Sequence, residues 1–222
     1  MSWILRDDQA EFERAPWAVR FKIAGKGPHL VIGDGVGQGA VAATTMTIEP
    51  RDASLGRAPI GTALPLSDSY IRQNDLIASF AESAPWHFGY QSDFKILDSD
   101  IAGMFCVEVW LSVQTSTLES HPQLVLQFRG QKEGEHYGCH QPGLWVHSSA
   151  QSAILVYPMD EPDCQMHREH SDLNMHVFGG FLEKGVIRRM RFRMLLSERV
   201  QSATVWKQCF QEFLESPLPL AT

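Results

Sequence analysis

The stretch GMFCVEVWLSVQT, residues 103–115, alternates two kinds of side chain along its whole length. Because successive side chains of a β-strand point to opposite faces of a sheet, this pattern predicts a long strand with one apolar face. The apolar parity comprises Phe105, Val107, Val109, Leu111 and Val113. The other parity comprises Cys106, Glu108, Trp110, Ser112 and Gln114. An isolated strand is not stable, so a chain that carries this segment must build a sheet around it.

Further short runs of β-branched and aromatic residues recur through the 222 residues, separated by turn sequences such as GKGP, HQPG and EKG. Residues 69–82, SYIRQNDLIASFAE, are typical of two short strands about Asn74-Asp75. Many short strands with frequent turns predict an all-β fold, an antiparallel β-sandwich or its larger supersandwich form. We expect residues 1–222 to form a single domain.

The end of the chain has a different period. In SERVQSATVWKQCFQEFLESP the apolar residues follow the spacing of a helix with one apolar face. The pattern predicts a helix over residues 198–215, with Glu198 in its first turn and Pro217 beyond its end. We expect this helix to pack on the outside of the sheets, and a partner-binding helix is the alternative.

Charge and composition limit the partners. Nineteen Lys and Arg against 26 Asp and Glu give a net charge of −7, which argues against a chain-wide basic surface for nucleic acid. No apolar run is long enough to span a membrane, and the N-terminal residues do not resemble a secretory signal. The four widely spaced cysteines are typical of reduced thiols, so a cytoplasmic protein is expected. The sequence leaves the oligomeric state open.

A glycine-rich stretch, HLVIGDGVGQGA at residues 29–40, is the closest match to a nucleotide-binding motif. Gly35, Gly37 and Ala40 fit the spacing G-x-G-x-x-A. The dinucleotide motif must open a helix, whereas the next residues, AVAATTMTIEP, favour a strand. We therefore interpret the stretch as a hairpin or bulge and predict no cofactor. Residues 51–65 and 160–172 are loop-like.

The stretch GVIRRMRFRMLL places three arginines on one side of a strand. Arg189, Arg191 and Arg193 share one parity, and the apolar residues between them share the other. Three adjacent cations repel one another, so acids from neighbouring strands or an anionic ligand must balance them. Cross-strand ion pairing and a ligand-binding face both remain open.

Trp110 lies among polar residues on its predicted strand face, and the following strand shows Gln127 and Arg129 on its polar side. An indole ring can stack on a sugar while polar groups bind its hydroxyls. A Trp that is exposed or covered by a helix is the alternative. The predicted ligand-binding residues are Trp110, Arg189, Arg191, Arg193, Arg129 and Gln127. Their possible neighbours are Tyr70, Arg72, Asp75, Trp86, His87, Tyr90 and Asp93.

Catalytic and metal-binding patterns are weaker. The chain has no G-x-S-x-G motif, so an enzyme would depend on acid–base chemistry by Glu108 or His87. Cys and His residues gather in two segments, but their spacing matches no standard zinc site, and we assign no metal. These residues are His136, Cys139, His140, Cys164, His167 and His170.

Two stretches, SDSYIRQNDLIASFAE and FLEKGVIRRMRFRMLL, together with the final helix, resemble a family of bacterial proteins of unassigned function. The resemblance implies one complete domain of that family and carries no catalytic residues. More loosely, a long all-β chain with a charged and aromatic face is similar to galactose-mutarotase-like proteins, a likeness at the level of the fold.

Three hypotheses follow from the sequence. The first is binding of a polar small ligand, a carbohydrate or an anionic sugar derivative, on the Arg and Trp faces. The second is a carbohydrate isomerase or hydrolase on the same face. The third is a protein-interaction domain without catalytic activity, which would use the helix or a sheet edge.

Overall fold

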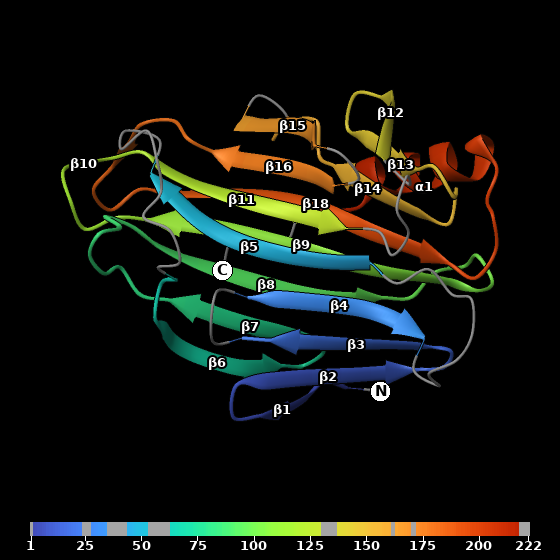
Figure 1. Ribbon diagram of the computed structural model, residues 1–222, viewed down its shortest axis with the longest axis horizontal. Helices are drawn as coiled ribbons and strands as arrows, with labels where there is room; N and C mark the ends of the chain where they lie inside the picture. The colour runs from blue at the N-terminus through green and yellow to red at the C-terminus, as the bar shows by residue number, and fades with distance from the viewer. Residues whose placement is uncertain are drawn as a thin grey trace.

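A computed structural model describes residues 2–23, 28–34, 44–52, 63–129, 137–160, 163–169 and 172–217. Within these residues the chain forms two eight-stranded antiparallel sheets, a two-stranded ribbon and one C-terminal helix (Figure 1). The strands of the two sheets run in similar directions in Figure 1, as in aligned sandwiches. The predicted fold class, an all-β sandwich with one C-terminal helix, is confirmed.

We call the first sheet sheet A, and its strand order is β1-β2-β3-β4-β5-β11-β16-β15. Its strands are β1 (Ile4–Arg6), β2 (Gln9–Arg14), β3 (Trp17–Lys22), β4 (His29–Asp34), β5 (Thr44–Asp52), β11 (Pro122–Arg129), β15 (Cys164–Glu169) and β16 (Asp172–Phe178). The sequence alone did not predict β1 and β2. It also suggested a loop over residues 160–172, and that is wrong for β15, whose largely exposed side chains follow no clear pattern. Pairing with β16 makes β15 an edge strand.

Sheet B has the order β12-β13-β14-β18-β9-β8-β7-β6. Its strands are β6 (Leu66–Arg72), β7 (Asp75–Phe80), β8 (Gly89–Leu97), β9 (Met104–Gln114), β12 (Tyr137–Gln141), β13 (Leu144–His147), β14 (Ser152–Val156) and β18 (Ile187–Ser197). The ribbon pairs β10 (Glu119–Ser120) with β17 (Leu182–Glu183). The hairpin predicted about Asn74-Asp75 is β6-β7, with its turn at Gln73 and Asn74.

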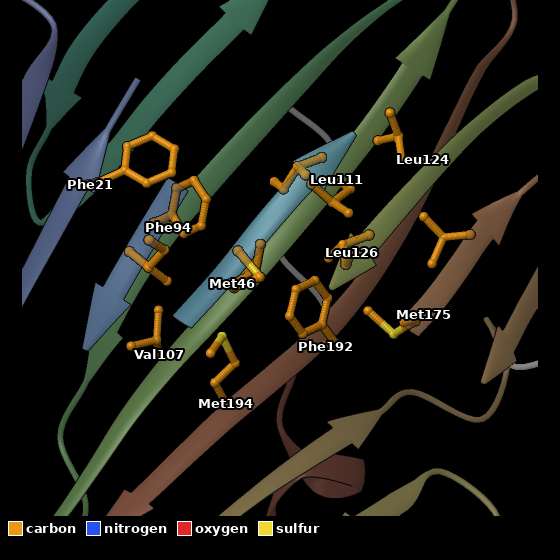
Figure 2. Close-up of a cluster of buried hydrophobic side chains, with 14 of the residues drawn as sticks. Phe21, Met46, Phe94, Val107, Leu111, Leu124, Leu126, Met175, Phe192 and Met194 are labelled. Atoms are coloured by element: carbon orange, nitrogen blue, oxygen red, sulfur yellow. The ribbon is translucent and has the colours of Figure 1, made fainter. Parts of the chain in front are cut away.

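The core lies between the two sheets. Phe21 of sheet A meets Phe94 of sheet B with 4.5 Å between ring centroids (Figure 2). Phe128 of sheet A meets Phe192 of sheet B edge-on at 6.0 Å. The inward parity of β9 belongs to this core, as its alternation predicted. Each central strand therefore turns its other parity away from the core, and on sheet B that parity includes the predicted Arg and Trp faces.

Helix α1 (Ala203–Glu215) lies on the outer face of sheet B. It buries Trp206, Cys209, Phe210 and Phe213 in an apolar cluster with side chains of β9, β13, β14 and β18. The predicted start at residue 198 is wrong by five residues, because β18 continues to Ser197 and the chain then needs several residues to turn. Ser202 caps the helix by accepting a hydrogen bond from the Val205 amide at 3.4 Å.

Two predicted segments lie largely outside the described residues. The glycine-rich residues 35–40 fall between β4 and β5, and most of the loop predicted at 51–65 follows β5. β4 and β5 are antiparallel neighbours, so a strand rather than a helix follows the glycine-rich segment. In the described part of the chain, no helix has the length and apolar character needed to cross a membrane.

Candidate ligand site on the outer face of sheet B

The arginine strand and the tryptophan strand are neighbours. β18 and β9 pair antiparallel along their full lengths, and in this register Arg191 lies opposite Trp110, Arg193 opposite Glu108 and Arg189 opposite Ser112. Residues paired in register share a face, so the two predicted faces form one surface. The strand order that decides this cannot be read from the separate sequence patterns.

The surface continues across β8, β7 and β6 in rows of paired residues. The first row is Arg72, Asp75, Lys95, Glu108 and Arg193. The second row is Tyr70, Ile77, Asp93, Trp110 and Arg191. The third row is Ser79, Gln91, Ser112 and Arg189. Helix α1 covers one part of this face, and the remaining part is open.

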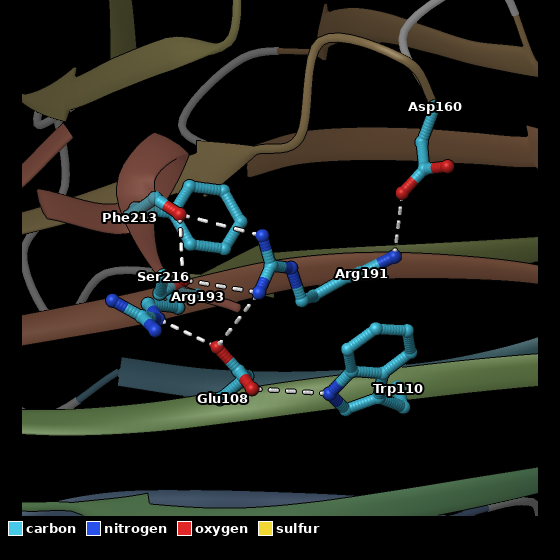
Figure 3. A network of polar contacts seen from close by, with 7 residues as sticks. All are labelled: Glu108, Trp110, Asp160, Arg191, Arg193, Phe213 and Ser216. Carbon is cyan, nitrogen blue, oxygen red and sulfur yellow. Dashed lines mark hydrogen bonds and ion pairs between the residues drawn. The ribbon is translucent and has the colours of Figure 1, made fainter. Parts of the chain in front are cut away.

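Arg191 lies under the helix and is 1% exposed. Its guanidinium donates to the main-chain oxygen of Phe213 at 3.3 Å and to the hydroxyl of Ser216 at 3.0 Å (Figure 3). It also lies 4.5 Å from the ring centroids of Tyr157 and Phe213. The last turn of α1 has no basic residue of its own, so Arg191 supplies the positive charge that stabilises a helix C-terminus.

Glu108 connects the covered part to the open part. Its Oε1 accepts a hydrogen bond from the Trp110 indole at 3.1 Å, and its Oε2 accepts one from Arg193 Nε at 2.7 Å. Arg191 Nη1 is a further 3.9 Å from Oε2. Both oxygens of this buried carboxylate are therefore engaged, and they fix the position of the Trp110 ring (Figure 3). These contacts offset the cost of burying the charge.

The open part contains a cavity of about 230 Å³, which we call the charged cavity. Trp110, Gln91 and Ser112 contribute to its wall. Six charged side chains also line it: Arg72, Asp75, Asp93, Lys95, Glu108 and Arg189. Gln91 donates a hydrogen bond to Ser79, and Trp110 donates one to Glu108, whereas the Ser112 side chain forms no hydrogen bond with other described residues. Because most of the polar lining is charged, this cavity suits a charged ligand.

A second cavity of about 550 Å³ adjoins it, and we call it the neutral cavity. Most of its polar lining consists of hydroxyl and amide groups: Ser67, Ser79, Gln91, Ser112, Gln114, Thr115 and Ser116. Gly89 permits the close approach of β7 and β8 in its wall, since a Cβ there would lie 2.8 Å from the Phe80 main-chain oxygen. Gln91, Ser112 and Arg189 line both cavities.

Comparison of the sequence with protein-family models and with curated proteins finds no match for this chain. The side chains of the two cavities therefore provide the observations that bear on function. Among them, Asp93 and Arg189 both keep hydrogen-bonding atoms that have no partner in the described part of the chain.

The surroundings of Asp93 disfavour ionisation of its carboxyl group. Burial raises its pKa to about 6, and the nearby Asp75 adds to this, while Arg72 and Lys95 oppose it. Its Oδ2 lies 3.6 Å from an Arg72 nitrogen, and among the described residues its buried Oδ1 has no hydrogen-bond partner. Perturbed carboxyl groups inside cavities are typical of functional sites.

Arg189 is exposed, and within the described residues it forms no ion pair or hydrogen bond. Its neighbours on the same strand differ, because Arg193 and Arg191 both contact Glu108. Arg189 therefore presents an unused guanidinium to both cavities. Such a group binds carboxylates and phosphates with two parallel hydrogen bonds.

Other predicted site residues lie elsewhere. Gln127 and Arg129 belong to β11 of sheet A, on the opposite side of the sandwich, where both donate to Asp172. The sequence placed them beside Trp110 because strand order was unknown. His87 is exposed in the segment before β8 and lines neither cavity.

The cysteines and histidines do not add a site on this face. Cys139 and His140 lie on β12 of sheet B, whereas Cys164 and His167 lie on β15 of sheet A. His136 and His170 are outside the described residues. In the described part, no three His, Cys, Asp or Glu residues lie close enough to hold a metal ion. Burial raises the pKa of the Cys106 thiol to about 12 and of the Cys209 thiol to about 11, so neither provides a thiolate near neutral pH.

Several cavity residues were missed by the sequence reasoning, among them Gln91, Lys95, Ser79 and Glu82. The signal for two of them is present in GYQSDFKIL, residues 89–97, where Gln91, Asp93 and Lys95 share one parity. That alternation predicts a polar strand face, but nothing in the sequence shows that β9 is its neighbour.

Proposed function

We propose that this protein binds a small anionic carbohydrate, such as a sugar acid, on the open outer face of sheet B. The observation that carries the proposal is the guanidinium of Arg189 at the junction of the two cavities, which has no hydrogen-bond or ion-pair partner among the described residues. An arginine without a partner, placed beside an aromatic ring and several hydroxyl groups, is the arrangement that a sugar carboxylate requires.

The balance of charge supports an anion. The charged cavity contains three cations and three carboxylates, but Glu108 is already offset by Arg193 and Arg191, which do not line the cavity. The remaining lining is therefore net positive at neutral pH. When Asp93 takes up a proton near its pKa of about 6, the excess of positive charge grows.

Trp110 supports a carbohydrate in particular. It is half-buried, its indole nitrogen is bound to Glu108, and the Arg191 guanidinium lies 5.5 Å from its ring centroid. These contacts hold the ring rigidly at the cavity wall. A fixed aromatic surface binds the apolar face of a sugar at a small cost in conformational entropy.

The test is calorimetric titration with galacturonate, glucuronate and N-acetylneuraminate, with neutral galactose as the control ligand. We expect at least one sugar acid to bind, and Arg189→Met to weaken that binding at least tenfold. Arg20→Met is the matched control, because Arg20 is an exposed arginine on β3 of sheet A. Equal binding by the wild type and Arg189→Met, or no binding of any sugar acid, would contradict the proposal.

A second candidate, favoured by the raised pKa and unpartnered oxygen of Asp93, is acid–base catalysis on the bound sugar. Protonated Asp93 would give its proton to a ring or glycosidic oxygen. The assays are anomer interconversion of galacturonate and cleavage of digalacturonate, followed by NMR. If Asp93 is the catalytic acid, the wild type should show a measurable reaction rate, and Asp93→Asn should abolish that rate while galacturonate still binds. An Asp93→Asn protein as active as the wild type would exclude this role.

A further inference from the structure

We infer that the ligand is a chain of sugar units that spans both cavities, with its acidic unit in the charged cavity and a second unit in the neutral cavity. This inference rests on the proposed function and names its substrate class, an acidic oligosaccharide. It is carried by the way the two cavities meet and by the difference in their linings.

The two cavities form successive sections of one surface. They share Gln91, Ser112 and Arg189, so they adjoin one another along these three side chains. Along β9 the lining begins at Glu108 in the charged cavity and continues to Gln114 in the neutral cavity. At about 3.3 Å per residue this distance is roughly 20 Å, which is longer than one sugar ring.

Apart from Glu82 and the shared Arg189, the polar side chains that line the neutral cavity carry hydroxyl and amide groups. Its carboxylate, Glu82, already accepts hydrogen bonds from the amide and hydroxyl of Ser116 at 2.8 and 2.9 Å. The side chains of Ser112 and Gln114 form no hydrogen bond with other described residues, so their donors and acceptors face the cavity unused. Uncharged donors and acceptors of this kind match the hydroxyls of a neutral or distal sugar unit.

The helix limits the surface at the other end. Along β9, Cys106 follows Glu108 on the same face, and it belongs to the apolar cluster beneath α1. A chain that places its acidic unit against Trp110 therefore ends there and extends in the direction of the neutral cavity. The predicted ligand is bound by its terminal unit.

The experiment compares galacturonate, digalacturonate and trigalacturonate by calorimetry on the full chain. We expect digalacturonate to bind at least tenfold more tightly than galacturonate. Ser79→Phe fills the neutral cavity from β7, and it should abolish the preference for digalacturonate over galacturonate. Because Ser79 Oγ also accepts a hydrogen bond from Gln91, galacturonate affinity is measured in the same variant and the ratio of the two affinities is compared. Thr45→Phe is the matched control, because Thr45 is a half-buried hydroxyl residue on β5 of sheet A.

A second variant, Gln114→Ala, removes an exposed side chain of the neutral cavity and should lower digalacturonate affinity several-fold in a protein of unchanged stability. If the wild type binds galacturonate and its dimer equally, the chain inference is wrong and the proposed function stands. If galacturonate binds and neither variant lowers the affinity for digalacturonate, the inference is also wrong. If none of the three probes binds, both the inference and the galacturonate form of the proposed function fail.

Discussion

Arg191 and Arg189 lie two residues apart on the same face of the same strand, yet they have opposite environments. Arg191 is 1% exposed and contacts Glu108, Phe213, Ser216 and the ring of Tyr157. Arg189 is exposed and contacts no other described residue through a hydrogen bond or ion pair. The same residue type at the same parity therefore serves the fold at one position and is available to a ligand at the other.

The cause of the difference is helix α1, which covers the outer face of sheet B only as far as Arg191. Among the described residues beneath the helix, the charges of Arg191, Arg193 and Glu108 are paired, as buried charges require, and among their buried polar atoms only Nε of Arg191 lacks a hydrogen bond. Beyond it, cations and carboxylates line cavities and keep unused hydrogen-bonding groups. Polar groups that have no hydrogen-bond partner and do not stabilise the fold are typical of binding sites.

The largest expected effect concerns the covered arginine. Arg191→Ala should lower the free energy of unfolding by about 3–5 kcal/mol, because it removes a buried ion-pair partner and leaves the end of α1 without its donors. Urea unfolding measures this change. Arg189→Met, two residues away, should change stability by less than about 0.5 kcal/mol. Similar losses in the two variants would show that the helix does not divide this face as described.

Asp93→Asn should stabilise the protein at pH 7 by up to about 3 kcal/mol. The folded-state pKa of about 6 lies above the value of 3.8 for an unperturbed aspartate, so the fold favours the protonated acid. The contribution of Asp93 to stability is therefore greatest below pH 4 and is lost as the pH rises through 6. The extra stability of the Asn variant over the wild type should therefore grow as the pH rises and vanish near pH 4. Urea unfolding between pH 4 and 8 tests this, and a pH-independent difference would contradict it.

A smaller effect should distinguish the chemistry of Arg189. Arg189→Lys keeps the positive charge but loses the planar pair of donors, so it should bind galacturonate with an affinity between those of the wild type and Arg189→Met. Calorimetry at constant ionic strength measures the three values. A lysine variant that binds as tightly as the wild type would show that charge alone is recognised there.

The smallest expected effect is the pH dependence of binding. Between pH 7 and pH 5, protonation of Asp93 removes a negative charge from the charged cavity, so the affinity for galacturonate should rise by a few-fold. Asp93→Asn should bind with an affinity that is nearly independent of pH in this range. Weaker wild-type binding at pH 5 than at pH 7 would contradict the assigned role of Asp93.

The sequence predicts those features that depend on local periodicity. The parities of β9 and β18, the hairpin at Asn74 and a C-terminal helix all follow from the spacing of apolar residues, because each element must bury one side. The sequence does not predict which strands are neighbours. It therefore left open whether Trp110 meets Arg191, with which it pairs directly, and it grouped Trp110 with Arg129, which lies on the other sheet.

The burial of individual polar residues was also beyond the sequence. Arg191 and Arg189 have the same parity and the same local pattern, and their difference depends on where α1 ends, which long-range packing decides. The raised pKa of Asp93 likewise depends on its burial between β7 and β9 and on the approach of Asp75 from the neighbouring strand. These are tertiary effects, whereas periodicity reports only the local chain.

The most direct test of the central claim is an NMR titration of the labelled protein with galacturonate, which reports each backbone amide separately. If the open part of sheet B binds the ligand, the largest shifts should fall on Gln91, Asp93, Trp110, Ser112 and Arg189, while amides of β11 in sheet A remain unchanged. Shifts that centre on sheet A, or an unchanged spectrum at saturating galacturonate, would contradict the claim that the uncovered half of this face is a ligand site.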